Sequence, residues 1–170
     1  MSKHPFFGGR LLGLSLPAAA LAALACSDGL LPLPQQGPPE AMEFTTGGFA
    51  AHTYRLEVRG DTVVAWLFEW SRPAPVDSAR SVPDPAEWQA FWEAAEEAGV
   101  QRWRKYRRDD VVDGGGYALT ITHEGRTLES WGSNAWPDHH GREHHEVTEA
   151  YLRFRDALDV LVGRPLIVRL

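Results

Sequence analysis

The chain has 170 residues, of which 44% are hydrophobic, and it carries a formal net charge of −6 at pH 7. This length predicts one domain with a single hydrophobic core. The negative balance argues against a general binder of polyanions, so we expect no nucleic-acid partner. The only cysteine is Cys26, which excludes an intramolecular disulfide and leaves the core to stabilise the fold.

The first 25 residues have the order of a secretory signal peptide. Lys3 and Arg10 give a positive start, an apolar run that ends in small residues comes next, and Cys26 follows it directly. A cysteine at this exit resembles the bacterial lipobox, in which the cysteine is lipidated and becomes the new N-terminus. The alternative is a plain secretory signal that is cut near Ala25 and leaves a free thiol. We expect residues 1–25 to be removed, which lowers the net charge to −8.

The mature chain is predicted to consist of an anchor, a tether and one domain. Residues 26–41 comprise the lipidated Cys26 and a proline-rich segment, which is typical of a semi-extended tether. Residues 42–170 form the predicted domain. The lipid would hold this domain at a membrane on the extracytoplasmic side, in the periplasm or at the cell surface.

Alternating apolar residues predict two β-hairpins. A short strand is expected over 42–46, and strands over 52–58 and 62–70 flank the turn at Gly60. Further along, 117–123 and 126–131 alternate in the same way around Glu124 and Gly125. The prediction leaves 71–83 and 132–142 as loops, with short strands at 100–108 and 166–168.

Two helices are predicted from apolar spacing and end signals. The first begins at the N-cap Asp84, with Glu87 three residues later, and ends before Gly99. The second is expected over 143–162, with Gly163 as its stop. The predicted inward-facing residues are Trp88, Phe91, Trp92, Ala95 and Ala98 in the first, and Val147, Tyr151, Phe154, Leu158 and Leu161 in the second.

These elements predict an α+β fold. We expect an antiparallel sheet of 4–6 strands with two helices packed on one face, in the order ββ(β)-α-(β)ββ-α-(β). Hairpins connect the strands, and no βαβ crossover pattern is present.

The segment Gly47-Gly48-Phe49-Ala50, followed by the strand over 52–58, resembles the emfourin family. These are small bacterial proteins named for a member that inhibits a thermolysin-type metalloprotease. Their opening is a short strand, a Gly-Gly-Phe-Ala-Gly turn and a strand, and then a helix and two further strands. The resemblance implies a protease as partner, but no inhibitory residue carries over from the family. Gly47, Gly48 and Phe49 are the candidate binding residues in this segment. Ala51 stands where the family tends to have glycine.

The segment Gly132-Ser133-Asn134-Ala135-Trp136-Pro137 resembles a second bacterial module. In that module a Trp and Tyr pair and an Asp-Gly turn precede a Gly-Ser-Asn-x-aromatic-Pro loop, as Trp103, Tyr106 and Asp113 do here. The resemblance names no function. Because aromatic side chains beside a polar loop are enriched at interfaces, we expect Trp131, Asn134 and Trp136 to lie at a binding surface.

A histidine tract provides the candidate metal ligands His139, His140, His144 and His145. On a helix, His140 and His144 would share one face. Zn²⁺ favours imidazole together with carboxylate ligands, so Glu143 or Asp138 could supply a third ligand. Gly141 interrupts such a helix, so a solvated loop is the other interpretation. The tract lacks the HExxH pattern of zinc proteases.

No catalytic signature surrounds the serine, histidine and acidic residues. Ser130 and Ser133, for example, lie in no G-x-S-x-G elbow. We therefore expect a non-enzymatic, lipid-anchored extracytoplasmic binding protein without a cofactor, with a protein such as a protease as ligand. The alternative is a metal-binding lipoprotein that holds zinc in its histidine-rich loop.

Overall fold

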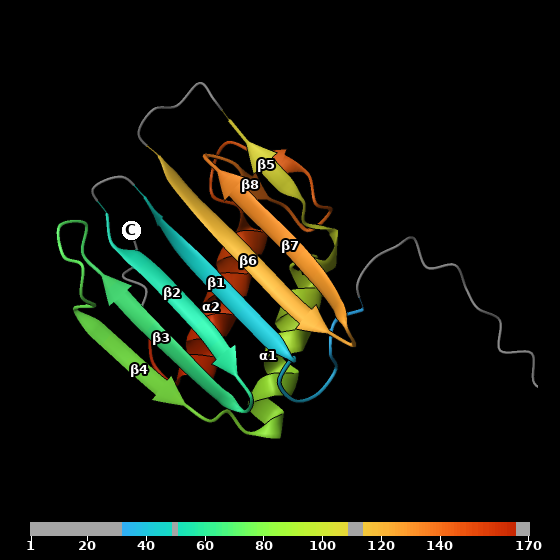
Figure 1. Cartoon of the computed structure of the whole chain (residues 1–170). Coiled ribbons are helices and arrows are strands. Elements are labelled where there is room, and N and C mark those ends of the chain that lie inside the picture. The colour runs from blue at the N-terminus through green and yellow to red at the C-terminus, as the bar shows by residue number, and fades with distance from the viewer. Residues whose placement is uncertain (1–31, 49–50, 109–113, 166–170) are drawn as a thin grey trace, which may run out of the picture.

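The computed structural model describes residues 32–48, 51–108 and 114–165, and shows an α+β fold. Cys26, Phe49 and the expected strand at 166–168 lie outside the described residues. Seven strands form one sheet in the order β4-β3-β2-β1-β6-β7-β5 (Figure 1). The strands are β1 (Ala41–Gly48), β2 (Thr53–Arg59), β3 (Thr62–Phe68), β4 (Asp77–Ser81), β5 (Lys105–Arg107), β6 (Gly115–His123) and β7 (Arg126–Ser133).

Smaller elements complete the described fold. The helices are α1 (Pro85–Glu97) and α2 (Glu149–Val162), with a short 3₁₀ helix η1 (Val100–Arg102) after α1. A separate pair of two-residue strands joins β8 (Trp136–Pro137) to β9 (Glu143–His144). No helix in the three described ranges is long and apolar enough to cross a membrane.

The structure confirms both predicted hairpins. In the first, β2 pairs with β3 from Thr53 opposite Phe68 to Arg59 opposite Thr62. In the second, β6 pairs with β7, and Glu124 and Gly125 both have positive φ at the turn. Positive φ at both central residues matches the right-handed twist of the flanking strands, which explains the tight two-residue connection.

The expected count of 4–6 strands was wrong, because the sheet has seven strands and one of its edge strands was not predicted. β4 lies in the segment that the sequence predicted as a loop, and it pairs antiparallel with β3. At the other edge, only three residues of the expected strand over 100–108 form β5, because the first three form η1. β5 also runs parallel to β7, so the sheet is mixed and not purely antiparallel.

The first helix begins and ends as predicted. The Asp84 side chain accepts hydrogen bonds from the backbone N–H groups of Ala86 and Glu87, and the Glu87 carboxylate accepts one from the Asp84 N–H. This reciprocal capping box satisfies donors that a helix start leaves open. Gly99, in the left-handed conformation, follows the helix end.

The second helix begins later than predicted, which corrects the view of the histidine tract. α2 starts at Glu149. Its N-cap is Thr148, whose side chain accepts a hydrogen bond from the Tyr151 N–H. His144 therefore lies in β9, and it does not share a helix face with His140. Val147, expected on the buried side, precedes the helix and is 46% exposed.

Both helices pack on one face of the sheet, and the core lies between them and the strands (Figure 1). The predicted apolar stripe of α1 is buried, as are Tyr151, Phe154, Leu158 and Leu161 of α2. Phe154 connects the layers, because its ring lies 5.6 Å from that of Phe44 in β1 and 5.8 Å from that of Phe91 in α1. Aromatic rings therefore supply much of this core.

The described part of the predicted tether lies against the domain. Leu33 packs on the core, and the Trp92 indole N–H donates a 2.8 Å hydrogen bond to the Gly37 carbonyl. The Gly125 N–H donates to the Glu40 carboxylate at 3.1 Å. The segment 32–40 thus runs beside α1 and the β6–β7 turn (Figure 1).

Candidate functional site

The predicted binding residues converge at one end of the central strands. Gly47 lies opposite Gly116, and Gly48 lies opposite Gly115, where β1 ends and β6 begins. The Asn134 N–H donates a 2.9 Å hydrogen bond to the Gly115 carbonyl. The structure thereby places the two segments that carried separate resemblances, 47–48 and 132–137, at the same end of the sheet, with the start of β6 between them.

Close backbone approach explains the glycines at this end. A Cβ atom on Gly114 would lie 1.4 Å from Asn134 Oδ1, and one on Gly132 would lie 2.1 Å from the Ala135 carbonyl oxygen. Asn134 itself has φ 53°, in the left-handed region that asparagine tolerates better than most residues. The Gly-Ser-Asn segment is therefore required for the packing of the loop.

The two tryptophans that flank this loop lie on opposite sides of the sheet. Trp136 is half-buried on the helix side, with its ring 6.0 Å from that of Tyr117 and 4.6 Å from that of Tyr151. Trp131 alternates with the buried Ser130 and Gly132, so it faces away from the helices. Of the predicted binding residues that the structure describes, Trp131 and Gly47 lie on the helix-free face.

One register row on the helix-free face crosses all seven strands. The row consists of Ser78, Trp66, Arg55, Thr45, Ala118, Trp131 and Lys105. Trp66 and Trp131 are half-buried and four strand spacings apart, roughly 19 Å at about 4.8 Å per strand. Between them the floor is formed mainly by small side chains, and the adjacent row adds Gly47 and Gly116.

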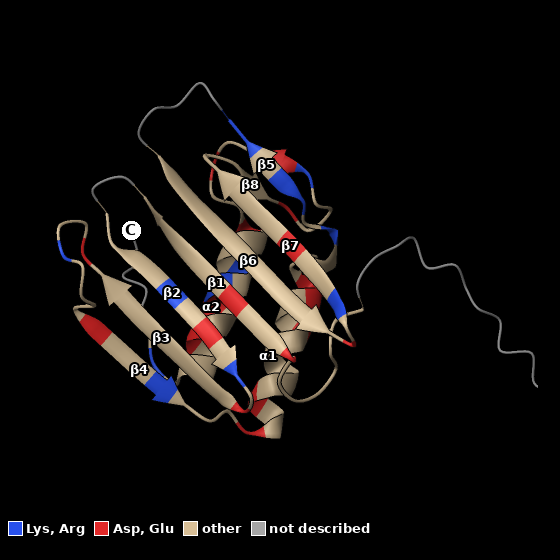
Figure 2. Ribbon diagram, in the orientation of Figure 1, with Lys and Arg blue, Asp and Glu red and all other residues tan. Residues whose placement is uncertain are grey.

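Charges on this face pair with one another and leave the aromatic region nearly neutral. Glu57 is 7% exposed and forms ion pairs with Arg55, at 2.6 Å, and with Arg59. Lys105 pairs with Glu129 at 2.7 Å at the other edge. β3 and β6 carry no Lys, Arg, Asp or Glu, whereas β2 carries three charged residues (Figure 2). Between the two indoles the row therefore holds one charged side chain, Arg55, which is paired with Glu57.

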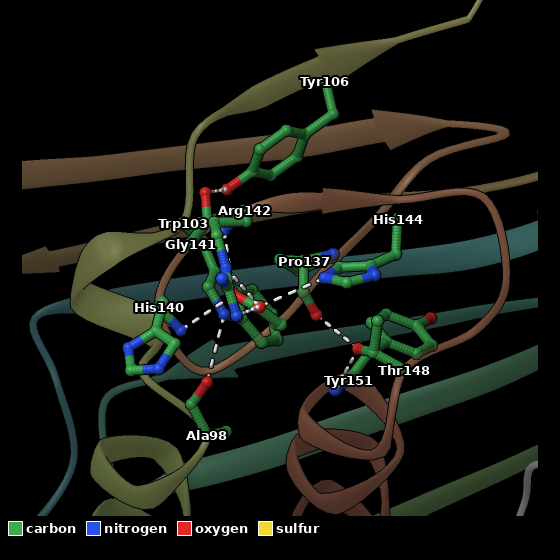
Figure 3. A network of polar contacts seen from close by, with 11 residues as sticks. Ala98, Trp103, Tyr106, Pro137, His140, Gly141, Arg142, His144, Thr148 and Tyr151 are labelled. Atoms are coloured by element: carbon green, nitrogen blue, oxygen red, sulfur yellow. Dashed lines mark hydrogen bonds and ion pairs between the residues drawn. The ribbon is translucent and has the colours of Figure 1, made fainter.

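The histidine tract folds around a buried carboxylate. Asp138 Oδ1 accepts 2.9 Å hydrogen bonds from the backbone N–H groups of His140 and Arg142, while Oδ2 lies 2.9 Å from the Arg142 Nε and 3.1 Å from the His144 Nε2 (Figure 3). Tyr106 holds the same turn, since its hydroxyl donates to the Gly141 carbonyl at 2.8 Å. Asp138 therefore organises the loop over 138–144.

These contacts shift the acidity of Asp138. Burial alone would raise its pKa, but the hydrogen bonds from Arg142, His144 and the His140 N–H outweigh burial and hold the pKa well below its ordinary value. Both carboxylate oxygens already have partners, so a metal ion at this turn would have to displace His144 or Arg142. No group of three or more His, Cys, Asp or Glu side chains in the described ranges is arranged to hold a metal ion.

We expect Asp138→Asn to lower the free energy of unfolding at pH 7 by about 1–3 kcal/mol, because the charge-assisted hydrogen bonds weaken. Since the folded-state pKa is depressed, the wild-type carboxylate stabilises the fold above about pH 4, and this contribution is lost as the pH falls further toward the folded-state value. Urea denaturation at pH 7 and pH 2.5 should therefore show a smaller difference between variant and wild type at the lower pH. An unchanged difference would contradict this role.

Sequence reasoning did not select Trp66 as a binding residue, and it considered Asp138 only as a possible third metal ligand. The alternation of 62–70 placed Trp66 on the same face as Val64 and Phe68, but alternation does not say which face the helices cover. Asp138 preceded the histidines in the sequence, and its position before a glycine-containing turn was the available signal.

Compared with known proteins, the sequence matches no family model, and a search of the curated proteins finds no match.

Proposed function

We propose that the protein is a non-enzymatic binding domain, held at an extracytoplasmic membrane surface by a lipid on Cys26, whose ligand is another protein. Support for the anchor comes from the signal-like residues 1–25 and the single cysteine that follows them. The emfourin-like Gly47-Gly48-Phe49-Ala50 segment makes a thermolysin-type metalloprotease the favoured class of ligand.

The observation that carries the binding proposal is the row from Trp66 to Trp131 on the helix-free face. Large aromatic side chains are enriched at protein interfaces, and charged residues are depleted at interface centres. Here two indoles and the half-buried Phe68 border small side chains, and the charges pair among themselves. Seven strands at about 4.8 Å each span roughly 34 Å, and strands of about seven residues at 3.3 Å each span roughly 23 Å. That area, near 800 Å², suits one side of a standard protein interface.

The anchor has a direct test. Cys26→Ser should move the protein from the detergent phase to the aqueous phase in a Triton X-114 partition, because the acyl chains that hold it in detergent are lost. Ser27→Ala, one residue away, should leave the partition unchanged. A wild-type protein that already partitions into water would refute the anchor.

The ligand class is tested by inhibition of thermolysin. We expect the Cys26→Ser chain to inhibit the protease, and Trp66→Ala with Trp131→Ala to raise the inhibitor concentration required at least tenfold, since central aromatic residues each contribute 2 kcal/mol or more at interfaces. Thr122→Ala with Thr127→Ala, at the far end of the same face, is the matched control and should inhibit normally. Absence of inhibition by the parent chain would remove this protease class, and equal inhibition by the tryptophan variant would remove this face.

Metal binding by the histidine tract is the alternative. Its support is the sequence composition, and the contacts of Asp138 with His144 and Arg142 weigh against it. We therefore favour protein binding over metal binding.

A further inference from the structure

A cavity of about 550 Å³ lies between α1 and the N-terminal segment. One face of α1 forms the first wall, because Gln89, Trp92, Glu93 and Glu96 recur at helical spacing. The opposite wall is the segment 32–36, and Gln101 and Arg126 complete the lining. This volume lies within the range of small-molecule sites in proteins.

The second wall is attached to the domain at several points. Pro34 is buried and Leu33 packs on the core. The hydrogen bond from the Trp92 indole to the Gly37 carbonyl fixes the chain directly after the cavity. Since Trp92 itself lines the cavity, one side chain both forms the floor and secures the wall.

The polar lining combines glutamine amides and Arg126 with two carboxylates and one buried acceptor that lacks a partner. Gln101 Oε1 is buried and has no hydrogen-bond partner among the residues that the structure describes. Glu93 and Glu96 add two carboxylates from the neighbouring wall, and Glu93 already accepts a 2.9 Å hydrogen bond from the Gln89 amide. A buried acceptor without a partner is costly, so a ligand that donates there would gain binding energy. With Arg126 included, the lining carries a net charge of −1, which a single ammonium group neutralises.

The apolar part of the lining specifies the rest of the ligand. Pro32, Leu33, Pro34 and the edge of the buried Trp92 contribute apolar atoms to the lining. An alkyl stem gains binding energy when it packs on such side chains. We propose that this cavity binds a primary ammonium group carried on a short apolar stem, supplied by a free alkyl amine or by a lysine side chain.

Calorimetric titration of the full chain in nonionic detergent tests this with two ligands that represent the two sources. These are 1,5-diaminopentane for free amines and N-acetyl-lysine amide for lysine side chains, and 1,5-pentanediol is the uncharged control. We expect at least one amine to bind and the diol to bind at least tenfold more weakly. Binding of the diamine alone assigns free amines, and binding of the lysine derivative, alone or with the diamine, includes lysine side chains. If neither amine binds, or if the diol binds equally well, the proposal is wrong.

Variants locate the binding in the cavity. Glu93→Gln with Glu96→Gln should weaken amine binding at least tenfold, because two charge-assisted hydrogen bonds are weakened. Glu143→Gln with Glu146→Gln removes the same charge from the histidine tract and should leave the affinity unchanged. Gln101→Leu keeps a similar volume without the buried acceptor and should also weaken binding. An affinity that falls equally in both double variants would show a general charge effect and overturn the assignment, as would unchanged binding in the Glu93 and Glu96 variant.

Discussion

Replacing Trp92 by alanine is expected to lower the free energy of unfolding by about 3–5 kcal/mol, the usual cost of removing a large buried ring. Trp92 is 2% exposed, and its ring lies 4.6 Å from that of Phe91 and 6.1 Å from that of Trp88. The substitution also removes the hydrogen bond to the Gly37 carbonyl, so the segment 32–37 loses an attachment point. Urea denaturation followed by far-ultraviolet circular dichroism measures the change without relying on tryptophan fluorescence.

Two further substitutions separate the contributions of Trp92. Trp70→Ala is the matched control, because Trp70 is 63% exposed, and we expect a loss below 1 kcal/mol. Trp92→Phe keeps most of the apolar volume but lacks the indole N–H, and should lose about 1–2 kcal/mol. If Trp92→Ala costs no more than Trp70→Ala, α1 does not pack on the sheet as described.

Gly132→Ala is expected to destabilise the domain by about 3 kcal/mol, at the upper end of overpacking effects. The added Cβ would lie 2.1 Å from the Ala135 carbonyl oxygen and 2.5 Å from Cε1 of Tyr117. Neither neighbour can withdraw easily, because one is backbone and the other is a buried ring. The substitution should therefore displace the loop that carries Asn134 and Trp136.

Gly125→Ala provides the comparison, since its φ is positive but nothing lies within 4 Å of the added Cβ. It should cost about 1 kcal/mol, from backbone strain alone. Equal effects at the two positions in thermal unfolding would mean that close contacts do not explain the glycine at 132.

Local signals in the sequence predicted the start of α1 and the two hairpins. Asp84 and Glu87 form a capping box within four residues, and Glu124 and Gly125 form a tight turn, so each is determined by its nearest neighbours. The inward side of α1 followed from apolar spacing for the same reason.

The remaining elements depend on partners distant in the chain. β4 has the sequence Asp-Ser-Ala-Arg-Ser, without strong strand formers, and it forms because the β3 backbone offers hydrogen bonds. β5 is parallel to β7, a pairing that no turn signal announces. At the histidine tract, Asp138 accepts hydrogen bonds from the His140 and Arg142 N–H groups, and residues 143–144 pair with β8, so α2 begins only after Thr148.

The candidate site was predictable only in part, for a related reason. The sequence indicated Gly47 and Trp131 as candidate binding residues. That they share a face of the sheet follows from the register of β1, β6 and β7. Trp66 belongs to the same row through β2 and β3, a relation that spans the whole sheet. Side chains so far apart in the chain meet only through strand order.

Photo-crosslinking in the native envelope tests the central claim, that a protein ligand binds the helix-free face. The crosslinking amino acid p-benzoylphenylalanine replaces Trp131 on this face in one chain, and the exposed Asp156 of α2 in the other. Cys26 remains in place, so the protein keeps its proposed location. We predict a discrete crosslinked protein from position 131 that is absent from position 156. A crosslink from position 156 alone, or the absence of any crosslink from position 131, would contradict the account.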